Sequence, residues 1–455
     1  MSSTSTESTL RTSRVTVAGR REVRGVHAVV QTIASKSAVL GLQAATGILT
    51  ARILGPAGRG ELAAMILWPL FVASVTTLGV PSALIYQLRS SANERNCLAT
   101  NGFVISAVIG VAAAAAAAWL LPWWLHQYSP GIIHAAQWFL VTVPLCSLTL
   151  AGRAVLEAAH DFSASNVIQI LTPFATLVGL LLFIMMHQFN PHTAALAYIA
   201  ASVPAFFLMI WRIGRIGVRV VKIQIAVLKQ ILQYGIRSYG IDILGTLALQ
   251  VDQVLVVSLL SAQAMGSYVV VLSLSRMLNV FQTSVVMVLF PKAAGQPARK
   301  VLEMTGNAVR ISGLATIGCG ICICLTGPSL LRMIYGTAYV AAAGALRILV
   351  LEAILSGVTF VLAQAFMALN RPGVVTLLQG VGLSLSIPMM LLLIPRYGIR
   401  GAAISLLVST TARLVFVCAG FIVFLKTRPP RLIPSPQDIQ QLASALRFPR
   451  REETA

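Results

Sequence analysis

Seven charged residues interrupt long apolar stretches of this sequence, where a charge needs a specific reason. They are the cations Lys36, Arg276, Arg347 and Arg413 and the carboxylates Asp242, Asp252 and Glu352. A charge in an apolar surrounding costs free energy, so it either pairs with an opposite charge or faces an aqueous cavity. In a cavity, Lys offers a point charge and Arg can bind phosphate oxygens bidentately. We therefore treat the four cations as candidate substrate-binding residues and the three carboxylates as candidates for ion coupling or charge pairing.

Ion pairing is the structural alternative to each of these roles. Asp252 and Arg276 are the clearest candidate pair, and Arg347 lies near enough to the end of its stretch to reach an interface. Asp242 and Asp252 are ten positions apart, which in a helix is roughly 15 Å of rise and 80° of rotation. The two carboxylates therefore cannot form a close acid–base dyad.

Other residue types that could do chemistry lack the necessary partners. The six Cys all fall in apolar stretches, and the C-x-x-C formed by Cys319 and Cys322 has no second pair. His187 and His192 share a loop without an acidic residue, and the chain has no Walker A, G-x-S-x-G or H-E-x-x-H motif. The sequence predicts no enzyme, no metal and no cofactor.

The composition places the apolar stretches in a membrane. Hydrophobic residues make up 57% of the 455 residues and charged residues 10%, against about 45–50% and about 25% in soluble proteins. Twelve stretches are long enough to cross a bilayer as helices: 29–51, 62–86, 97–121, 134–152, 164–186, 194–211, 238–260, 266–290, 308–331, 343–369, 373–394 and 401–425. Because the apolar runs are continuous, a barrel is excluded. We expect an all-α polytopic membrane protein with about 12 transmembrane helices.

The distribution of Lys and Arg predicts the orientation. With a cytoplasmic N-terminus, 24 of the 34 Lys and Arg fall on the inner side, five fall outside and five lie in or at the ends of the spans. Both termini should then be cytoplasmic. We expect the protein to lie in the cytoplasmic (inner) membrane. This bias, with anionic membrane lipids as partners, also explains the net charge of +21 without any nucleic acid.

The spans divide into two groups of six around a basic segment. We expect a disordered basic cytoplasmic tail (1–28), an N-lobe (29–211), a basic amphipathic linker (212–237), a C-lobe (238–425) and a second basic tail (426–455). The linker pattern fits a helix lying in the membrane interface. A shift of 206 positions aligns Gly60 with Gly266, which suggests two pseudo-twofold related six-helix lobes.

Motifs along the whole chain resemble a known family. They read ARILGPAGRGELA (51–63), GVPSALIY (79–86), YGIRSYGIDILGTLALQVDQVLV (234–256), VLFPKAAG (288–295), LLRMIYGTAYVAAAGALRIL (330–349), ALNRP (368–372) and PRYGIRGAAIS (395–405). In this order they resemble the polysaccharide flippases of the multidrug/oligosaccharidyl-lipid/polysaccharide exporter (MOP) superfamily, of the O-antigen type.

The resemblance implies a function. Such proteins flip oligosaccharides linked to undecaprenyl pyrophosphate from the inner to the outer leaflet, by alternating access around a cationic cavity, for surface polysaccharide biosynthesis. A lipid-linked oligosaccharide is then the substrate, and a polysaccharide polymerase is a candidate partner. A multidrug/cation antiporter of the same superfamily is the main alternative, and a membrane-embedded glycan polymerase or ligase is a remote one, because the outer loops are short.

The predicted topology can be tested with reporter fusions. Alkaline phosphatase fused after Ala455 should be inactive, because it folds only outside the cytoplasm, whereas a fusion within residues 187–193 should be active. Activity of the C-terminal fusion would contradict the topology and the even number of spans.

Overall fold

The computed structural model describes residues 4–91, 94–293 and 295–432. Most of the segment 426–455, for which we expected a second basic tail, lies outside these residues. Within them the chain is helical and has no strand, so the predicted all-α polytopic membrane fold is confirmed.

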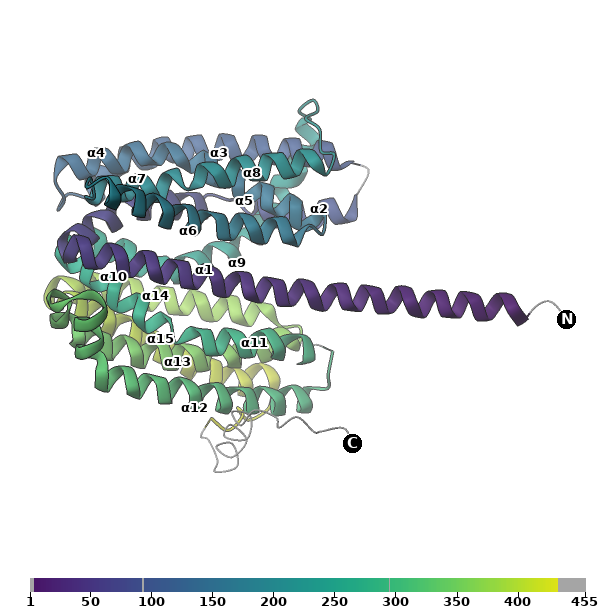
Figure 1. Ribbon diagram of the computed structural model, residues 1–455. Coiled ribbons are helices and arrows are strands. Elements are labelled where there is room, and N and C mark those ends of the chain that lie inside the picture. The colour runs from purple at the N-terminus through teal and green to yellow at the C-terminus, as the bar shows by residue number, and fades with distance from the viewer. Residues whose placement is uncertain (1–3, 92–93, 294, 433–455) are drawn as a thin grey trace, which may run out of the picture. The chain divides into compact units, whose positions relative to one another are not determined.

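The helices follow one another through short connections (Figure 1). The first half contains α1 (Thr4–Val75), α2 (Val80–Ser90), α3 (Arg95–Trp124), α4 (Pro130–Phe139), the 3-10 turn η2 (Leu140–Thr142), α5 (Val143–Ala158), α6 (Phe162–Met185), α7 (Pro191–Ala200) and α8 (Ser202–Arg215). The second half contains α9 (Ile225–Leu259), α10 (Ala262–Arg276), α11 (Asn279–Ala293), α12 (Ala298–Leu330), the π-helix η3 (Leu331–Tyr335), the 3-10 helix η4 (Thr337–Ala342), α13 (Ala343–Ala368), α14 (Pro372–Tyr397) and α15 (Ile399–Leu425).

Helix α1 contains two crossings joined at a kink. Its apolar part, Ala34–Val75, is 42 residues long, or roughly 63 Å at 1.5 Å per residue, twice the hydrocarbon thickness. Gly55 separates the two parts with φ 67° and ψ −178°, a conformation that a residue with a side chain rarely adopts. Among the described residues, ten helices are long and apolar enough to span a membrane, and α10 with α11, bent by 41°, adds an eleventh span. Dividing α1 at Gly55 brings the number to the predicted twelve.

The start of α1 differs from the sequence expectation. We expected residues 1–28 to be disordered, but the helix already begins at Thr4. Extending an existing helix adds one hydrogen bond per residue without a new nucleation cost, which explains how the polar segment continues the apolar helix.

The described chain forms two compact units. The first contains the described residues of 4–47, 68–120 and 135–239, and the second those of 48–67, 121–134 and 240–432. In the first unit, Leu84, Leu98 and Val155 pack with Ile231 in one hydrophobic core. In the second, Val361, Phe366 and Phe421 lie in another core, so each unit has an apolar centre of its own.

The basic linker is only partly helical. Residues 218–224 are irregular, although we expected an interfacial helix here. The backbone N–H groups of Arg219, Val221 and Gln224 instead donate to the side-chain oxygens of Asn96 (3.1 Å), Thr100 (3.2 Å) and Asn101 (3.0 Å) at the start of α3. These side-chain acceptors replace the hydrogen bonds of a helix. From Ile225 the chain is helical as expected.

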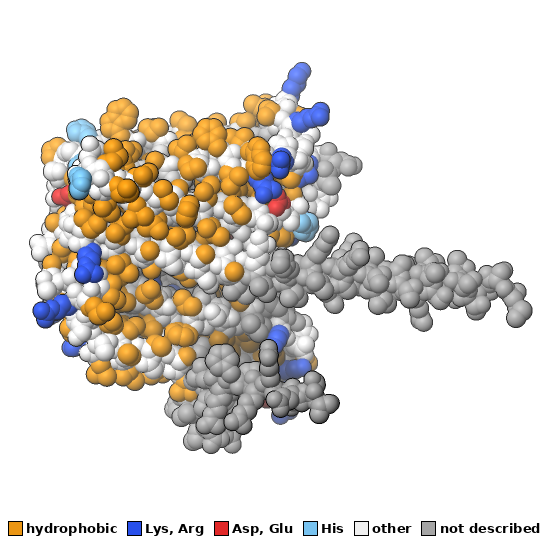
Figure 2. Space-filling model, viewed as in Figure 1, with side chains coloured by type: hydrophobic (Ala, Val, Ile, Leu, Met, Phe, Trp, Pro, Cys, Tyr) orange, Lys and Arg blue, Asp and Glu red, His pale blue; other side chains and the backbone are white. Residues whose placement is uncertain are grey.

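The surface of the first unit is that of a lipid-embedded bundle. On the face in Figure 2, hydrophobic side chains cover the flanks of the helices, and Lys and Arg gather near the ends. Trp119 and Trp138 are exposed at one end of the spans. Trp211 is exposed at the end of α8, with the guanidinium of Arg215 4.2 Å from its ring. Tryptophan at both ends is the pattern of the two membrane interfaces.

Two glycines allow a close helix crossing in the second unit. A Cβ on Gly60 would overlap the carbonyl oxygen of Ala262, and a Cβ on Gly266 would overlap the carbonyl oxygen of Pro56. The shift of 206 positions that aligned Gly60 with Gly266 also aligns Pro56 with Ala262, so it converts one contact into the other. The contact is therefore reciprocal, as expected if the second part of α1 and α10 are related by a pseudo-twofold axis.

Replacing Gly266 with Ala should destabilise this crossing. The new methyl group would meet backbone atoms that cannot move independently, and overpacking of this kind costs about 1–3 kcal/mol. Gly318→Ala, in α12 with open space around it, serves as the matched control and should not lower stability. Thermal unfolding of both purified variants in detergent measures the difference, and equal melting temperatures would contradict the crossing.

Candidate functional site

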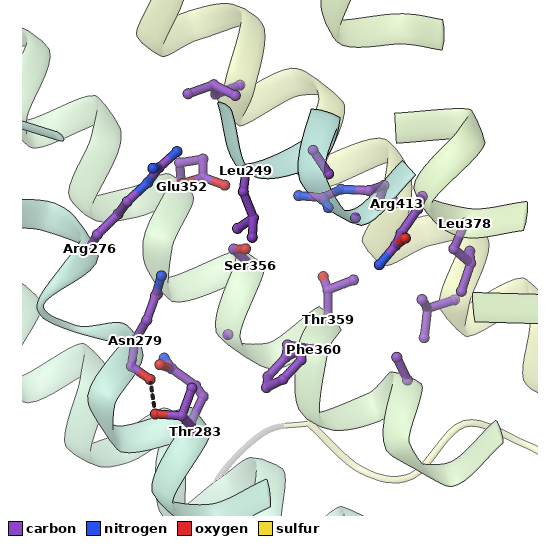
Figure 3. Close-up of a pocket in the computed structure, with 18 of the residues that line it drawn as sticks. Leu249, Arg276, Asn279, Thr283, Glu352, Ser356, Thr359, Phe360, Leu378 and Arg413 are labelled. Atoms are coloured by element: carbon purple, nitrogen blue, oxygen red, sulfur yellow. Dashed lines mark hydrogen bonds between the residues drawn. The ribbon is translucent and has the colours of Figure 1, made fainter. Parts of the chain in front are cut away.

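A cavity of about 430 Å³ lies among the helices of the second unit. Its volume is that of a small-molecule binding site. The walls come from α9, α10, α11, α13, α14 and α15, and they combine apolar side chains such as Leu249 and Phe360 with polar groups such as Asn279 and Ser356. Three charged residues, Arg276, Glu352 and Arg413, also line it (Figure 3).

Arg276 is held at the cavity wall by a buried carboxylate. Its Nη2 atom donates to Oδ2 of Asp252 at 3.0 Å, so the anticipated ion pair is present. The hydroxyl of Tyr268 donates to the same oxygen at 2.9 Å. The Asp252 side chain is 2% exposed and that of Arg276 34% exposed. Asp252 therefore lies behind Arg276 and orients it, while the guanidinium still reaches the cavity.

Thr410 links Arg413 to Glu352. Nη2 of Arg413 donates to Oγ1 of Thr410 at 2.8 Å, and that hydroxyl donates to Oε1 of Glu352 at 2.7 Å. In Figure 3, Arg276 lies beside Glu352, and the guanidinium of Arg413 points toward Glu352 from the other side. The two arginines and the carboxylate thus face one space.

Glycine on α14 makes room for Arg413. A Cβ on Gly382 would overlap Cδ of Arg413, so the arginine stem lies directly against the α14 backbone. Ser409 on α15 donates to the carbonyl oxygen of Gly382 at 2.7 Å and keeps the two helices together. This contact sets the position from which Arg413 enters the cavity.

The cavity carries a small excess of positive charge. Two arginines and one carboxylate line it, while Asp252 is buried behind them. Nε of Arg413 and Oδ1 of Asp252 have no hydrogen-bond partner within the described residues. The unused Nε donor of Arg413 and the two arginines in the lining suit an anionic group that accepts hydrogen bonds. Across the described part of the chain, no three His, Cys, Asp or Glu residues come together as a metal site would require.

The other predicted site residues lie elsewhere. Lys36 is exposed on α1 in the first unit. Asp242 is exposed on α9 and does not line the cavity. Arg347 is exposed on α13, five residues before Glu352, and five residues correspond to about 140° of rotation around a helix. It therefore points away from the cavity that Glu352 lines.

The structure also adds residues that sequence reasoning missed. Thr410 is three positions before Arg413, so the two share a helix face, a spacing that could have revealed their contact. Tyr268 and Gln282 have no comparable signal, because their partners lie on other helices. Asp252 accepts from Tyr268, and Thr316 accepts from Gln282 at 2.9 Å.

Solved structures with the same fold are membrane transporters. The chain resembles the lipid II flippase MurJ in its inward closed conformation (TM-score 0.75, 13% identity, covering 91% of this chain and 90% of that one). It also resembles an inward-facing multidrug resistance MATE family transporter of the MOP superfamily (TM-score 0.64, 15% identity, 90% and 96%). A MOP superfamily transporter from Pyrococcus furiosus, described as having a binding pocket of reverse polarity, matches with TM-score 0.59 and 15% identity over 92% and 96%.

The sequence itself matches one family profile. None of the curated proteins matches this sequence. The profile of the polysaccharide biosynthesis protein family matches residues 49–344, which is more than half of the chain. The chain therefore belongs to the polysaccharide biosynthesis protein family, and it has the multi-pass membrane fold of the transporter structures named above.

Proposed function

We propose that this protein flips an oligosaccharide linked to undecaprenyl pyrophosphate from the inner to the outer leaflet of the cytoplasmic membrane. It does so by alternating access, for surface polysaccharide biosynthesis. The observation that carries the proposal is the pair of arginines, Arg276 and Arg413, that face one cavity among the helices of the second unit. A pyrophosphate entering such a unit needs compensating positive charge, because an isolated anion there is strongly destabilised.

The two arginines differ in their hydrogen-bond partners, and both arrangements suit the binding and release of an anion. Arg276 uses Nη2 for Asp252, which leaves its other N–H groups for phosphate oxygens. Arg413 reaches Glu352 only through Thr410. A diphosphate bound between the arginines would compete with Glu352 for their charge, so protonation or displacement of this carboxylate would accompany binding. Glu352 is thus the candidate coupling residue, and Asp252 the residue that keeps Arg276 in place.

Lys36 is a further proposed contact. It is exposed on α1 of the first unit, and we propose that it supplies positive charge to the diphosphate during transfer. Anionic lipids would bind the basic cytoplasmic segments, and a polysaccharide polymerase would receive the flipped substrate. With both termini cytoplasmic, the substrate enters from the side where its sugars are assembled.

A multidrug/cation antiporter is the second candidate. It is supported by the likeness to MATE transporters and by the carboxylates Asp252 and Glu352, which could hold a cationic drug. The two arginines that line the same cavity oppose it, because they would repel such a drug. Export of cationic dyes therefore separates the two candidates.

Removing the cavity charge should lower flipping by the protein that reaches the membrane, and Arg276→Gln should also lower stability because it leaves the buried Asp252 without its partner. We expect Arg276→Gln and Arg413→Gln, and to a smaller extent Lys36→Gln, to accumulate lipid-linked oligosaccharide on the inner leaflet and to lower surface glycan. Each change keeps a polar side chain but removes a charge that the diphosphate needs. The measurement is surface-glycan complementation in a host without its own flippase, alongside immunoblotting of membrane fractions.

Two controls accompany this experiment. Arg396→Gln removes an exposed cation at the end of α14 and should leave complementation unchanged. Lys36→Arg retains the charge and should preserve most activity. If all three Gln variants reach normal membrane levels and restore full surface glycan, these cations do not bind the substrate. Dye export that depends on Glu352 would instead support the antiporter.

Displacing Arg413 without changing any charge should also impair flipping. In Gly382→Ala the new methyl group overlaps the arginine stem, and a misplacement of about 1 Å in a binding group can cost up to 10²-fold in rate. We expect initial flipping rates to fall by about tenfold or more in reconstituted vesicles. Gly380→Ala, on the same helix with open space around it, is the matched control. Equal rates for the two variants would show that the position of Arg413 is unimportant.

A further inference from the structure

Arg59 is buried in the second unit, far along the chain from the cavity arginines. It belongs to the second part of α1, four residues after the kink at Gly55, and is 8% exposed. In the predicted topology Arg59 falls in the outer connection between the spans 29–51 and 62–86, where a solvated side chain is expected. A buried position for an outer-loop arginine therefore needs an explanation.

The guanidinium of Arg59 has no partner within the described residues. Its Nε and Nη1 atoms are buried without hydrogen bonds, and no carboxylate of the described chain lies within ion-pair distance. Glu61 is two positions away, a spacing at which helical side chains do not face each other. Arg59 also lies in the first turn after the kink, where the helix end is positive and disfavours a cation.

Such an arrangement is costly unless an anion completes it. Leaving a buried charge uncompensated destabilises a protein strongly, whereas an Arg can bind a phosphate-type anion through two parallel hydrogen bonds. On the planar guanidinium fork, the N–H groups of Nε and of Nη1 each run parallel to one of Nη2, so an anion at either edge would satisfy one of the two buried donors.

Two tyrosines connect the end of the second unit to α1. The rings of Tyr335 in η3 and Tyr339 in η4 lie 6.1 Å apart. The hydroxyl of Tyr339 donates to the carbonyl oxygen of Ala51 at 2.9 Å. The hydroxyl of Tyr335 donates to no group in the described part of the chain. The reciprocal crossing of Gly60 with α10 fixes the backbone next to Arg59.

We propose that Arg59 binds a phosphate-type anion at the outer end of the second unit. Its placement on the outer side rests on the proposed topology. Two sources carry this chemistry in the outer leaflet: the phosphodiester headgroup of a phospholipid, and the diphosphate of the flipped carrier, the latter resting on the proposed function. This second anion site is separate from the cavity lined by Arg276 and Arg413, none of whose lining residues comes from α1, η3 or η4.

The proposal predicts phosphate-dependent stabilisation of the purified full-length protein in a neutral detergent. The probes are inorganic pyrophosphate and dioctanoyl phosphatidylglycerol, and dioctanoylglycerol, which lacks phosphate, is the blank. A ligand that binds only the folded state raises Tm, by about 2–4 °C at saturation. Arg59→Gln should lose this rise, and Arg59→Met, an apolar replacement of similar length, provides a second variant if Arg59→Gln does not accumulate.

Two controls isolate Arg59. Arg332→Gln removes an exposed cation of η3 and should keep the full rise in Tm. A parallel series in an Arg276→Gln, Arg413→Gln background removes binding in the cavity, so the result does not depend on whether the flipping proposal holds. A rise with phosphatidylglycerol alone identifies the phospholipid headgroup as the source, and a rise with pyrophosphate alone identifies the carrier diphosphate.

Two results would overturn the proposal. One is that neither phosphate probe raises Tm of the wild-type protein above that with dioctanoylglycerol. The other is that the Arg59 variants retain the rise in the background without cavity arginines.

Discussion

The free-energy cost of an unpaired charge in an apolar surrounding governs how this chain is built. The same cost applies to unpaired backbone groups, which is why every span is a helix. It explains why Lys and Arg gather in the connections and why Asp252 lies directly behind Arg276, at 3.0 Å. Few charges therefore remain inside the second unit, and the surroundings of each one need a specific explanation.

In the cavity, carboxylates hold the two arginines in place while the guanidinium groups still face the cavity. Asp252 is almost fully buried and fixes Arg276, while Glu352 shares the cavity wall with both arginines. Thr410 transmits the influence of Glu352 to Arg413 through two short hydrogen bonds. In the proposed function, a substrate anion would replace the carboxylate in this network and exchange one set of charge-assisted hydrogen bonds for another.

Close backbone approach is the second requirement of this fold. In lipid, helices associate through van der Waals packing, so small residues mark the crossings. Gly60 and Gly266 allow one such crossing in the second unit, and Gly79 and Gly235 allow another in the first. At Gly382 the space left by the missing side chain is filled by the aliphatic stem of Arg413 rather than by the backbone of another helix. The crossings position the helices, and Gly382 positions one of the two cavity cations.

The sequence by itself determined the helical membrane fold, the number of crossings and the family, because hydrophobic length and charge bias are local properties of each segment. It also identified Arg276, Asp252, Glu352 and Arg413 as charges that need partners. Only the tertiary structure decided which partners they have, since Tyr268 and Thr410 gain their roles from contacts between helices. For the same reason Arg59, which read as an exposed loop cation, is buried: the packing around a helix crossing, not the local sequence, sets the exposure of a side chain.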